Sequence, residues 1–173
     1  MKTALIALTL VFFLVIVVGL FLSTHFSRAR SITIQADAER VYTILSDLER
    51  WPEWTPWEKD PTLTTALGPL KQGVGATRTW TGKDREEELK LVSCVPATVV
   101  AYEMTYRRGG ETTVMKGALS MRAIGAATEV TWSLEGDMHV PVLGGYVVLV
   151  GGGALDAMFD RGLANLKRLA EAQ

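Results

Sequence analysis

Side chains that could carry acid–base or metal chemistry are scarce in this sequence. Histidine occurs only at His25 and His139, so a histidine-based metal site or a Ser-His-Asp triad lacks its material. The sequences G-x-S-x-G and H-E-x-x-H are absent. Glu53, Glu58 and Glu103 could act as general bases if they were desolvated, but such carboxylates more often form a solvated face. The sequence therefore predicts no metal and no cofactor, and it leaves the catalytic residues unknown.

Tryptophan is the residue type whose spacing is most unusual. The chain has five tryptophans, and three of them, Trp51, Trp54 and Trp57, lie three residues apart in ERWPEWTPWEKD, residues 49–60. Two prolines stand between them and predict a fixed turn, because proline restricts its own backbone and that of the residue before it. An indole ring combines a large apolar area with one N–H donor. The pattern indicates a binding architecture, and it does not name a reaction.

Composition limits the class of protein. The length of 173 residues suits one domain with a small appendage. Lys and Arg total 18 against 19 Asp and Glu, a net charge of −1. This balance offers no basic surface for a phosphate backbone, so we expect no nucleic-acid partner. The single Cys94 cannot form an intramolecular disulfide, and we interpret it as a small buried apolar residue.

The N-terminal stretch ALIALTLVFFLVIVVGLFL, residues 4–22, contains 19 residues and no charge. At ~1.5 Å per residue a helix of this length reaches about 28 Å, close to the ~30 Å hydrocarbon thickness of a bilayer. A cleaved signal peptide is the alternative, but its apolar stretch is usually shorter and ends in small residues of A-x-A type. We therefore expect an uncleaved single-pass membrane anchor, with residues 1–30 as anchor and tether.

The orientation of this anchor depends on the flanking charges. Lys2 and the α-amino group precede the apolar stretch, whereas Arg28 and Arg30 follow it, so the charges nearly balance. A very short charged N-terminal tail often stays in the cytoplasm. On that ground we predict that the soluble domain lies outside the cytoplasm.

The remainder, residues 31–173, begins with a strand and a helix. Residues 31–35 alternate apolar and polar side chains, as a half-buried strand does. Asp37 can cap a helix whose apolar residues recur at helical spacing as far as Leu48. Pro52 after Trp51 then ends that helix.

Period-two patterns follow the tryptophans, and a final amphipathic helix closes the chain. The helix covers residues 153–173, with an apolar stripe that must be buried against another element. A strand-helix start, a run of antiparallel strands and a closing helix predict an α+β fold. The predicted strands of the run lie within residues 75–82, 86–95, 98–106, 112–122 and 128–136.

Two segments carry a resemblance to a known superfamily. SITIQADAERVYTILSDLERWPEWTPW, residues 31–57, and FDRGLANLKRLAEA, residues 159–172, resemble the START-related, polyketide cyclase and dehydrase (SRPBCC) proteins, which include the birch-pollen allergen fold. Asp37 replaces a proline that is common at that point of the family. The resemblance implies a helix-grip fold, in which a curved antiparallel sheet wraps around the long C-terminal helix and leaves an apolar cavity. Members carry lipids, bind hormones or quinones, cyclise polyketides or regulate chaperones, so the fold alone does not select a function.

The resemblance places the tryptophan turn close to the cavity mouth and the inner strand faces around the cavity. Two interpretations stay open for these residues: they fill the core, or they line a ligand site and its entrance, where Trp54 or Trp57 could also touch the bilayer interface. Flexible methionines and tyrosine hydroxyls favour the ligand site. The predicted ligand-binding residues are Trp54, Trp57, Trp80, Tyr102, Met104, Tyr106, Met115, Trp132 and Phe159.

The glycine-rich segment HVPVLGGYVVLVGGG, residues 139–153, precedes the closing helix. It is either a gate over the cavity or a buried, irregular connection. Its glycines match neither a P-loop nor a dinucleotide-binding pattern.

The sequence is compatible with three functions. The first is a membrane-tethered binding domain for a hydrophobic small molecule or lipid, since an anchor raises the local concentration of a membrane-borne ligand. The second is a cyclase-, dehydratase- or aromatase-type enzyme that uses Glu103, His139 or a tyrosine as its acid or base. The third is a protein-interaction module at the membrane.

Overall fold

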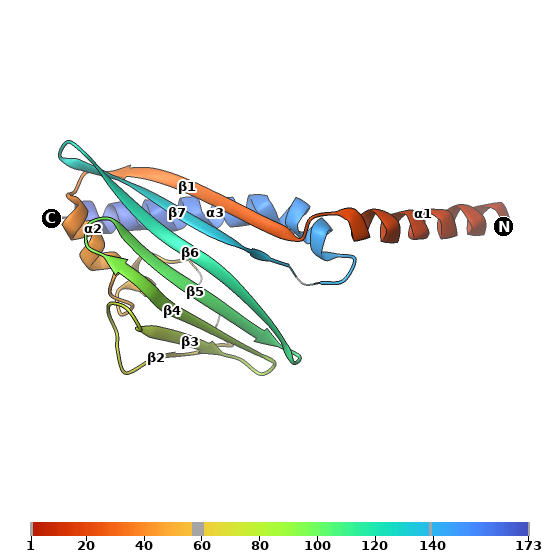
Figure 1. Ribbon diagram of the computed structural model, residues 1–173, viewed down its shortest axis with the longest axis horizontal. Helices are drawn as coiled ribbons and strands as arrows, with labels where there is room; N and C mark the ends of the chain where they lie inside the picture. The colour runs from red at the N-terminus through yellow and green to blue at the C-terminus, as the bar shows by residue number, and fades with distance from the viewer. Residues whose placement is uncertain (1, 57–60, 139, 173) are drawn as a thin grey trace.

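A computed structural model describes residues 2–56, 61–138 and 140–172 of the chain. One seven-stranded antiparallel sheet and one long helix dominate the domain, and a separate helix precedes them (Figure 1). The elements are α1 (Lys2–Phe21), β1 (His25–Ile34), α2 (Ala38–Leu45), the 3-10 turn η1 (Trp51–Glu53), β2 (Thr64–Leu67), β3 (Thr77–Thr81), β4 (Arg85–Val95), β5 (Val99–Arg108), β6 (Glu111–Ile124), β7 (Ala127–Asp137) and α3 (Gly144–Glu171).

The sheet has the strand order β1-β7-β6-β5-β4-β3-β2. The first strand, β1, is therefore an edge strand and pairs with the last strand, β7. Helix α3 packs along β1, and α2 packs near the end of the sheet farthest from α1 (Figure 1). One face of the sheet therefore turns toward the helices and the other toward solvent. This α+β arrangement with a long C-terminal helix confirms the helix-grip-like fold that the resemblance implied.

The turn from β1 into α2 contains the helix cap that the sequence predicted at Asp37. The Asp37 carboxylate accepts a hydrogen bond from the backbone N–H of Arg40 at 2.8 Å and so caps the helix. Val41, Ile44 and Leu45 form the buried side of α2. Trp51 then starts η1 as the chain turns at Pro52.

Strand β1 starts earlier than the alternation of residues 31–35 predicted. It begins at His25, which pairs with Asp137 of β7. Residues 25–30, the last part of the expected anchor and tether (residues 1–30), are therefore the first part of a sheet strand. The sequence did not predict this longer strand, because the charged residues Arg28 and Arg30 occupy positions where the alternation requires apolar side chains. The short strand β2 was not predicted either, and its residues are mostly exposed.

Helix α3 starts at Gly144, nine residues before the predicted helix. Most of the glycine-rich segment is thus helical, and the interpretation as an irregular connection is wrong from that residue on. Each glycine costs a helix about 1 kcal/mol relative to alanine, which is why the sequence argued against a helix here. His139 lies outside the described residues, and the gate interpretation stays a prediction.

Helix α1 is the one helix in the described ranges that is long and apolar enough to cross a membrane, a character that signal sequences share. Its C-terminal half packs on the first turn of α3, where the Tyr146 hydroxyl donates a hydrogen bond to the Val15 carbonyl oxygen at 2.9 Å. A Cβ at Gly19 would collide with the carbonyl of Val142, so the missing side chain permits this approach. Figure 1 shows α1 leaving the domain at the end where α3 begins.

Candidate binding site

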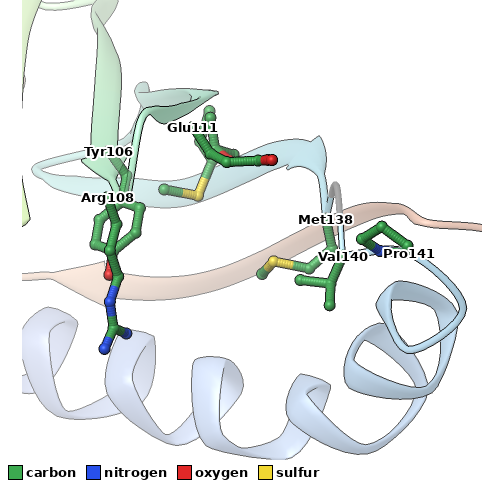
Figure 2. A pocket seen from close by; sticks show the side chains of 8 residues that line it. Tyr106, Arg108, Glu111, Met138, Val140 and Pro141 are labelled. Atoms are coloured by element: carbon green, nitrogen blue, oxygen red, sulfur yellow. The ribbon is translucent and has the colours of Figure 1, made fainter.

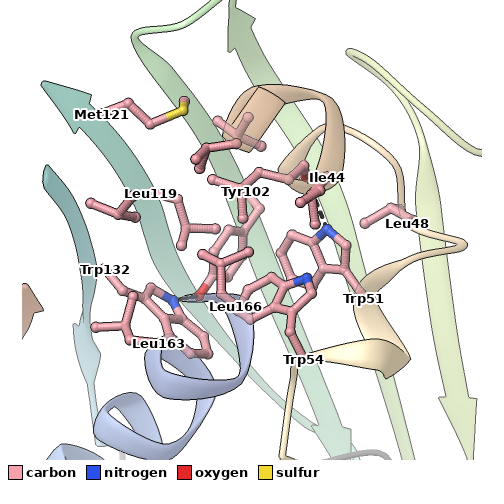
Figure 3. Packing of buried hydrophobic residues seen from close by; sticks show 14 of the residues in the cluster. Ile44, Leu48, Trp51, Trp54, Tyr102, Leu119, Met121, Trp132, Leu163 and Leu166 are labelled. Atoms are coloured by element: carbon pink, nitrogen blue, oxygen red, sulfur yellow. Dashed lines mark hydrogen bonds between the residues drawn. The ribbon is translucent and has the colours of Figure 1, made fainter. Parts of the chain in front are cut away.

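The end of the grip far from α1 is filled by aromatic rings (Figure 3). Trp51 has no exposed surface, and its indole N–H donates a hydrogen bond to the Leu45 carbonyl at 2.9 Å. Its ring centroid lies 5.2 Å from that of Trp54 and 5.5 Å from that of Tyr102. These distances are typical of tilted and edge-to-face aromatic packing. The tryptophan turn therefore anchors the loop after α2 in the core.

Trp132 connects this cluster to α3. Its ring lies 5.2 Å from Trp54 and stacks on Phe159 at 4.7 Å. Its indole N–H donates to the Tyr102 hydroxyl oxygen at 2.8 Å, deep in the core. Burial raises the pKa of the Tyr102 phenol far above its usual value. Tyr102 therefore stays neutral at ordinary pH and is unsuited to act as a base.

Most of the predicted ligand-binding residues belong to this packed region. Trp54, Trp80, Tyr102, Trp132 and Phe159 are at most 3% exposed. A ligand could reach these rings only if the core opened, so their role in binding stays a prediction. The core interpretation explains their packing without a ligand.

Two indoles of the core have no hydrogen-bond partner within the part of the chain that the structure describes. These are the Nε1–H groups of Trp54 and Trp80. An unsatisfied buried donor costs about 1–3 kcal/mol. Trp80 has a partial compensation, since the guanidinium carbon of Arg78 lies 5.6 Å from its ring centroid in a cation–π contact.

The end of the grip beside α1 is hollow. A cavity of about 580 Å³ opens there between the β5-β6 hairpin and the segment that leads into α3 (Figure 2). Two predicted residues, Tyr106 and Met115, are on its wall. Met104 is partly buried and pairs with Met115 across β5 and β6, and Trp57 lies outside the described residues. The wall consists of Tyr106, Arg108, Glu111, Thr113, Met115, Met138, Val140 and Pro141.

A second cavity of about 210 Å³ adjoins the first and shares Met115 and Met138 with it. It lies between the first half of β1 and the first half of α3. Apart from Arg28, every residue of its lining is apolar. These residues are Phe26, Arg28, Met115, Leu134, Met138, Val147, Val148, Gly151, Gly152 and Leu155.

Sequence reasoning missed most of these wall residues for two reasons. Phe26 and Arg28 lay in the expected tether, and Val147 lay in the expected irregular segment. One available signal was the alternation itself: Phe26 and Arg28 have the same parity as Ile32 and Ile34 and so share their face of β1.

The segment between the cavity and α1 has a constrained backbone. Val140 and Pro141 are on the cavity wall, and the next residue, Val142, has a positive φ of 63°. That conformation is unusual for a β-branched residue and needs support from its surroundings. The Val142 carbonyl lies against Gly19, so the same short segment joins the cavity wall to α1.

The candidate acid–base groups are not gathered at one point. Glu103 is on the outer face of β5, opposite Lys116 of β6, and so faces away from α3. Cys94 is partly buried in β4, and desolvation raises the pKa of its thiol. No group of three or more His, Cys, Asp or Glu side chains that could hold a metal occurs among residues 2–56, 61–138 and 140–172.

Solved structures share this architecture at low sequence identity. A protein from Chromobacterium violaceum has a TM-score of 0.62 and 15% identity, over 84% of this chain and 96% of its own. One from Rhizobium leguminosarum has a TM-score of 0.61 and 16% identity, over 86% and 96%. DynU16, from the dynemicin biosynthetic locus, has a TM-score of 0.54 and 14% identity, over 82% and 46%. Identities of this size show the fold alone.

Comparison with curated protein sequences yields no match. A family model described as "Polyketide cyclase / dehydrase and lipid transport" matches residues 25–171. This range runs from the first residue of β1 to the last residue of α3, so it includes residues 25–30 of β1, for which the sequence predicts a tether. The chain therefore belongs to the polyketide cyclase, dehydrase and lipid transport family of the SRPBCC superfamily.

Proposed function

We propose that this protein is a membrane-tethered binding domain for a hydrophobic or amphipathic small molecule, and that the hollow end of the grip is its site. The observation that carries the proposal is the cavity of about 580 Å³, whose wall combines apolar side chains with Arg108, Glu111 and Thr113. Ligand pockets commonly measure about 300–1,000 Å³ and combine apolar walls with a few polar groups. Met115 and Met138 supply adaptable walls, since methionine side chains repack easily.

The position of this cavity beside α1 supports the membrane part of the proposal. Val140 and Pro141 line the cavity, and Tyr146, a few residues later, holds α1 through its hydrogen bond to Val15. Apolar side chains on the first turns of α3 continue the exposed apolar surface of α1. Leu149 and Val150 are 71% and 80% exposed. With α1 in a bilayer, this surface would lie in the interface and the cavity would open next to the lipid.

A tether then has a physical purpose. A ligand that dissolves in the bilayer is concentrated there, and a cavity held at the interface meets it more often than a freely diffusing one would. The proposal keeps the predicted topology, with the domain outside the cytoplasm and the short tail of Lys2 inside.

The direct test is native mass spectrometry of the full-length protein released from its own membranes, followed by extraction and identification of bound molecules. We expect a stoichiometric apolar or amphipathic ligand. Folded protein without a ligand, and without uptake of any from a membrane lipid extract, would contradict the proposal. A fluorescent fusion of the full chain should fractionate with membranes, and cleavage behind residue 22 would contradict the tether.

A cyclase- or dehydratase-type enzyme is the second candidate. The family description includes such enzymes, and Tyr106 and Glu111 bring two titratable side chains to the cavity wall. In this case Glu111→Gln should stop conversion of a ligand recovered from membranes and leave its binding intact. Equal loss of binding and conversion would argue against a dedicated catalyst.

A further inference from the structure

Arg28 stands out in the smaller cavity because, among the described residues that line it, Arg28 alone is charged. It belongs to the inward-facing side of β1, where it pairs with Leu134 of β7 and is partly buried. Its guanidinium lies against Gly152 of α3, where a Cβ would come within 2.7 Å of the Arg28 Cζ atom. The glycine thus provides the space in which the guanidinium rests, between strand and helix.

Arg28 takes part in no hydrogen bond or ion pair within the described ranges, in contrast to its neighbour on the same strand face. Arg30, two residues along β1, forms an ion pair with Asp160 of α3 at 3.1 Å. None of the described residues that line the smaller cavity is acidic. A partly buried cation without a counter-charge is unfavourable, and an anion that enters the cavity would relieve this cost.

Arg108 does not offer the same selectivity. It is exposed at the hairpin end of the larger cavity, and its cross-strand partner is Glu111. The opposite charge on the next strand weakens its attraction for an anion. Arg28 is therefore the cation that can orient a ligand inside the cavities.

We propose that the cavities bind an amphiphile with one anionic head group, a carboxylate or a phosphate, which pairs with Arg28. This inference rests on the proposed binding function. The planar guanidinium offers parallel N–H donors that match either head group in a bidentate geometry. The alkyl part then lies along Met115 and Met138, which the two cavities share, and extends toward Tyr106 in the larger one.

The test compares three ligands of equal chain length, namely dodecanoate, dodecyl phosphate and dodecan-1-ol. The full-length protein is placed in phosphatidylcholine nanodiscs, and retention of each radiolabelled ligand is measured against empty nanodiscs. We expect the wild type to bind at least one of the anions about tenfold more tightly than the alcohol, as charge-assisted hydrogen bonds imply. The preferred anion identifies the head group.

Two matched pairs of variants assign this preference to Arg28. R28Q should remove it by lowering the retention of the anions to that of the alcohol, whereas R30Q should keep it, because Arg30 already has Asp160. G152A should weaken anion binding by displacing the guanidinium, whereas G153A should not, since Gly153 is not among the residues that line the cavity and a Cβ there meets nothing within 4 Å. The glycine pair keeps both arginines, so it tests the site even if R28Q fails to fold.

The outcomes separate the two proposals. If the wild type binds the alcohol and the anions equally, or if R28Q and G152A keep the preference for anions, the role of Arg28 is overturned and the hydrophobic site survives. If none of the three ligands is retained above empty nanodiscs, the cavity as a binding site and the role of Arg28 both fail.

Discussion

The two ends of the grip are built from the same helix and the same strands, yet one is packed and the other is hollow. In its second half, α3 places Phe159, Leu163 and Leu166 in the aromatic core. In its first half, it presents Gly151 and Gly152 to a cavity. The volume of the helix side chains therefore decides which part of the sheet is covered by protein and which part is left for another molecule.

The burial of the inward-facing side chains decreases along strand β5. Its inward residues pass from fully buried Val100 and almost fully buried Tyr102, through partly buried Met104, to Tyr106 on the cavity wall. All four are even-numbered residues of one strand, so their side chains point to the same face of the sheet. The different environments come from what lies opposite each residue, which is the tryptophan turn at one end and the glycine-rich half of α3 at the other.

The largest expected effect is on stability at the packed end. Trp132→Ala should lower the free energy of unfolding by about 3–5 kcal/mol, because it leaves a hole among buried rings and removes the hydrogen-bond donor to Tyr102. Chemical denaturation of the full-length protein in detergent, followed by near-ultraviolet circular dichroism, measures this. The matched change at the hollow end, Tyr106→Ala, should cost about 1 kcal/mol or less, since its ring already borders open space. Equal losses of unfolding free energy in the two variants would contradict the distinction between a packed end and a hollow end.

An intermediate effect is expected from alkaline pH. Burial raises the folded-state pKa of Tyr102 above that of the unfolded phenol, so its contribution to stability is complete below about pH 10. Above that pH the unfolded chain releases the proton and the folded protein retains it. Stability should therefore fall by about 1.4 kcal/mol per pH unit from this residue, up to its folded-state pKa.

Tyr102→Phe is the variant that isolates this contribution. Its free energy of unfolding should be lower than that of the wild type at neutral pH, because Trp132 loses its hydrogen-bond acceptor. Between about pH 9 and about pH 11, however, it should decline less steeply than the wild type. Parallel pH profiles for the two proteins would show that the phenol is not as enclosed as the structure describes.

The smallest effect on stability, with a large effect on binding, is expected at the hollow end. Thr113→Trp would project an indole from β6 into the larger cavity and fill space that is otherwise open. The free energy of unfolding should change by about 0.5 kcal/mol or less, whereas retention of dodecanoate should fall by about tenfold or more. Thr112→Trp is the control, because Thr112 is exposed on the opposite face of the same strand. Unchanged ligand retention in Thr113→Trp would place the ligand elsewhere.

Much of the packed end could be predicted from the sequence. The cap at Asp37, the buried face of α2 and the stripe from Phe159 to Ala170 follow from short periodic patterns that the structure keeps. The core interpretation of the tryptophan turn agrees with the burial of Trp51 and Trp54. Dense apolar periodicity predicts such regions well, because each residue in them obeys the same rule of burial.

The hollow end could not be predicted in this way, since its residue types are unusual for their strand or helix positions and are explained only by their tertiary contacts. Arg28 occupies an inward position of β1, and Gly152 lies in the middle of a helix. Each residue is unfavourable on local grounds, and each makes sense only in contact with the other. The sequence consequently pointed to Tyr106 and Met115 on the cavity wall but missed Phe26, Arg28 and Met138.

Some properties were determined by the sequence alone. The apolar length of α1, the alternation of the strands and the scarcity of histidine do not depend on what any residue touches. Only the tertiary structure decided that Trp132 would be core and Tyr106 would be wall, although both point inward from the same sheet. The physical reason is that burial depends on the volume of the opposing element. Phe159 fills that volume above Trp132, and the glycines near the start of α3 leave it open beside Arg28.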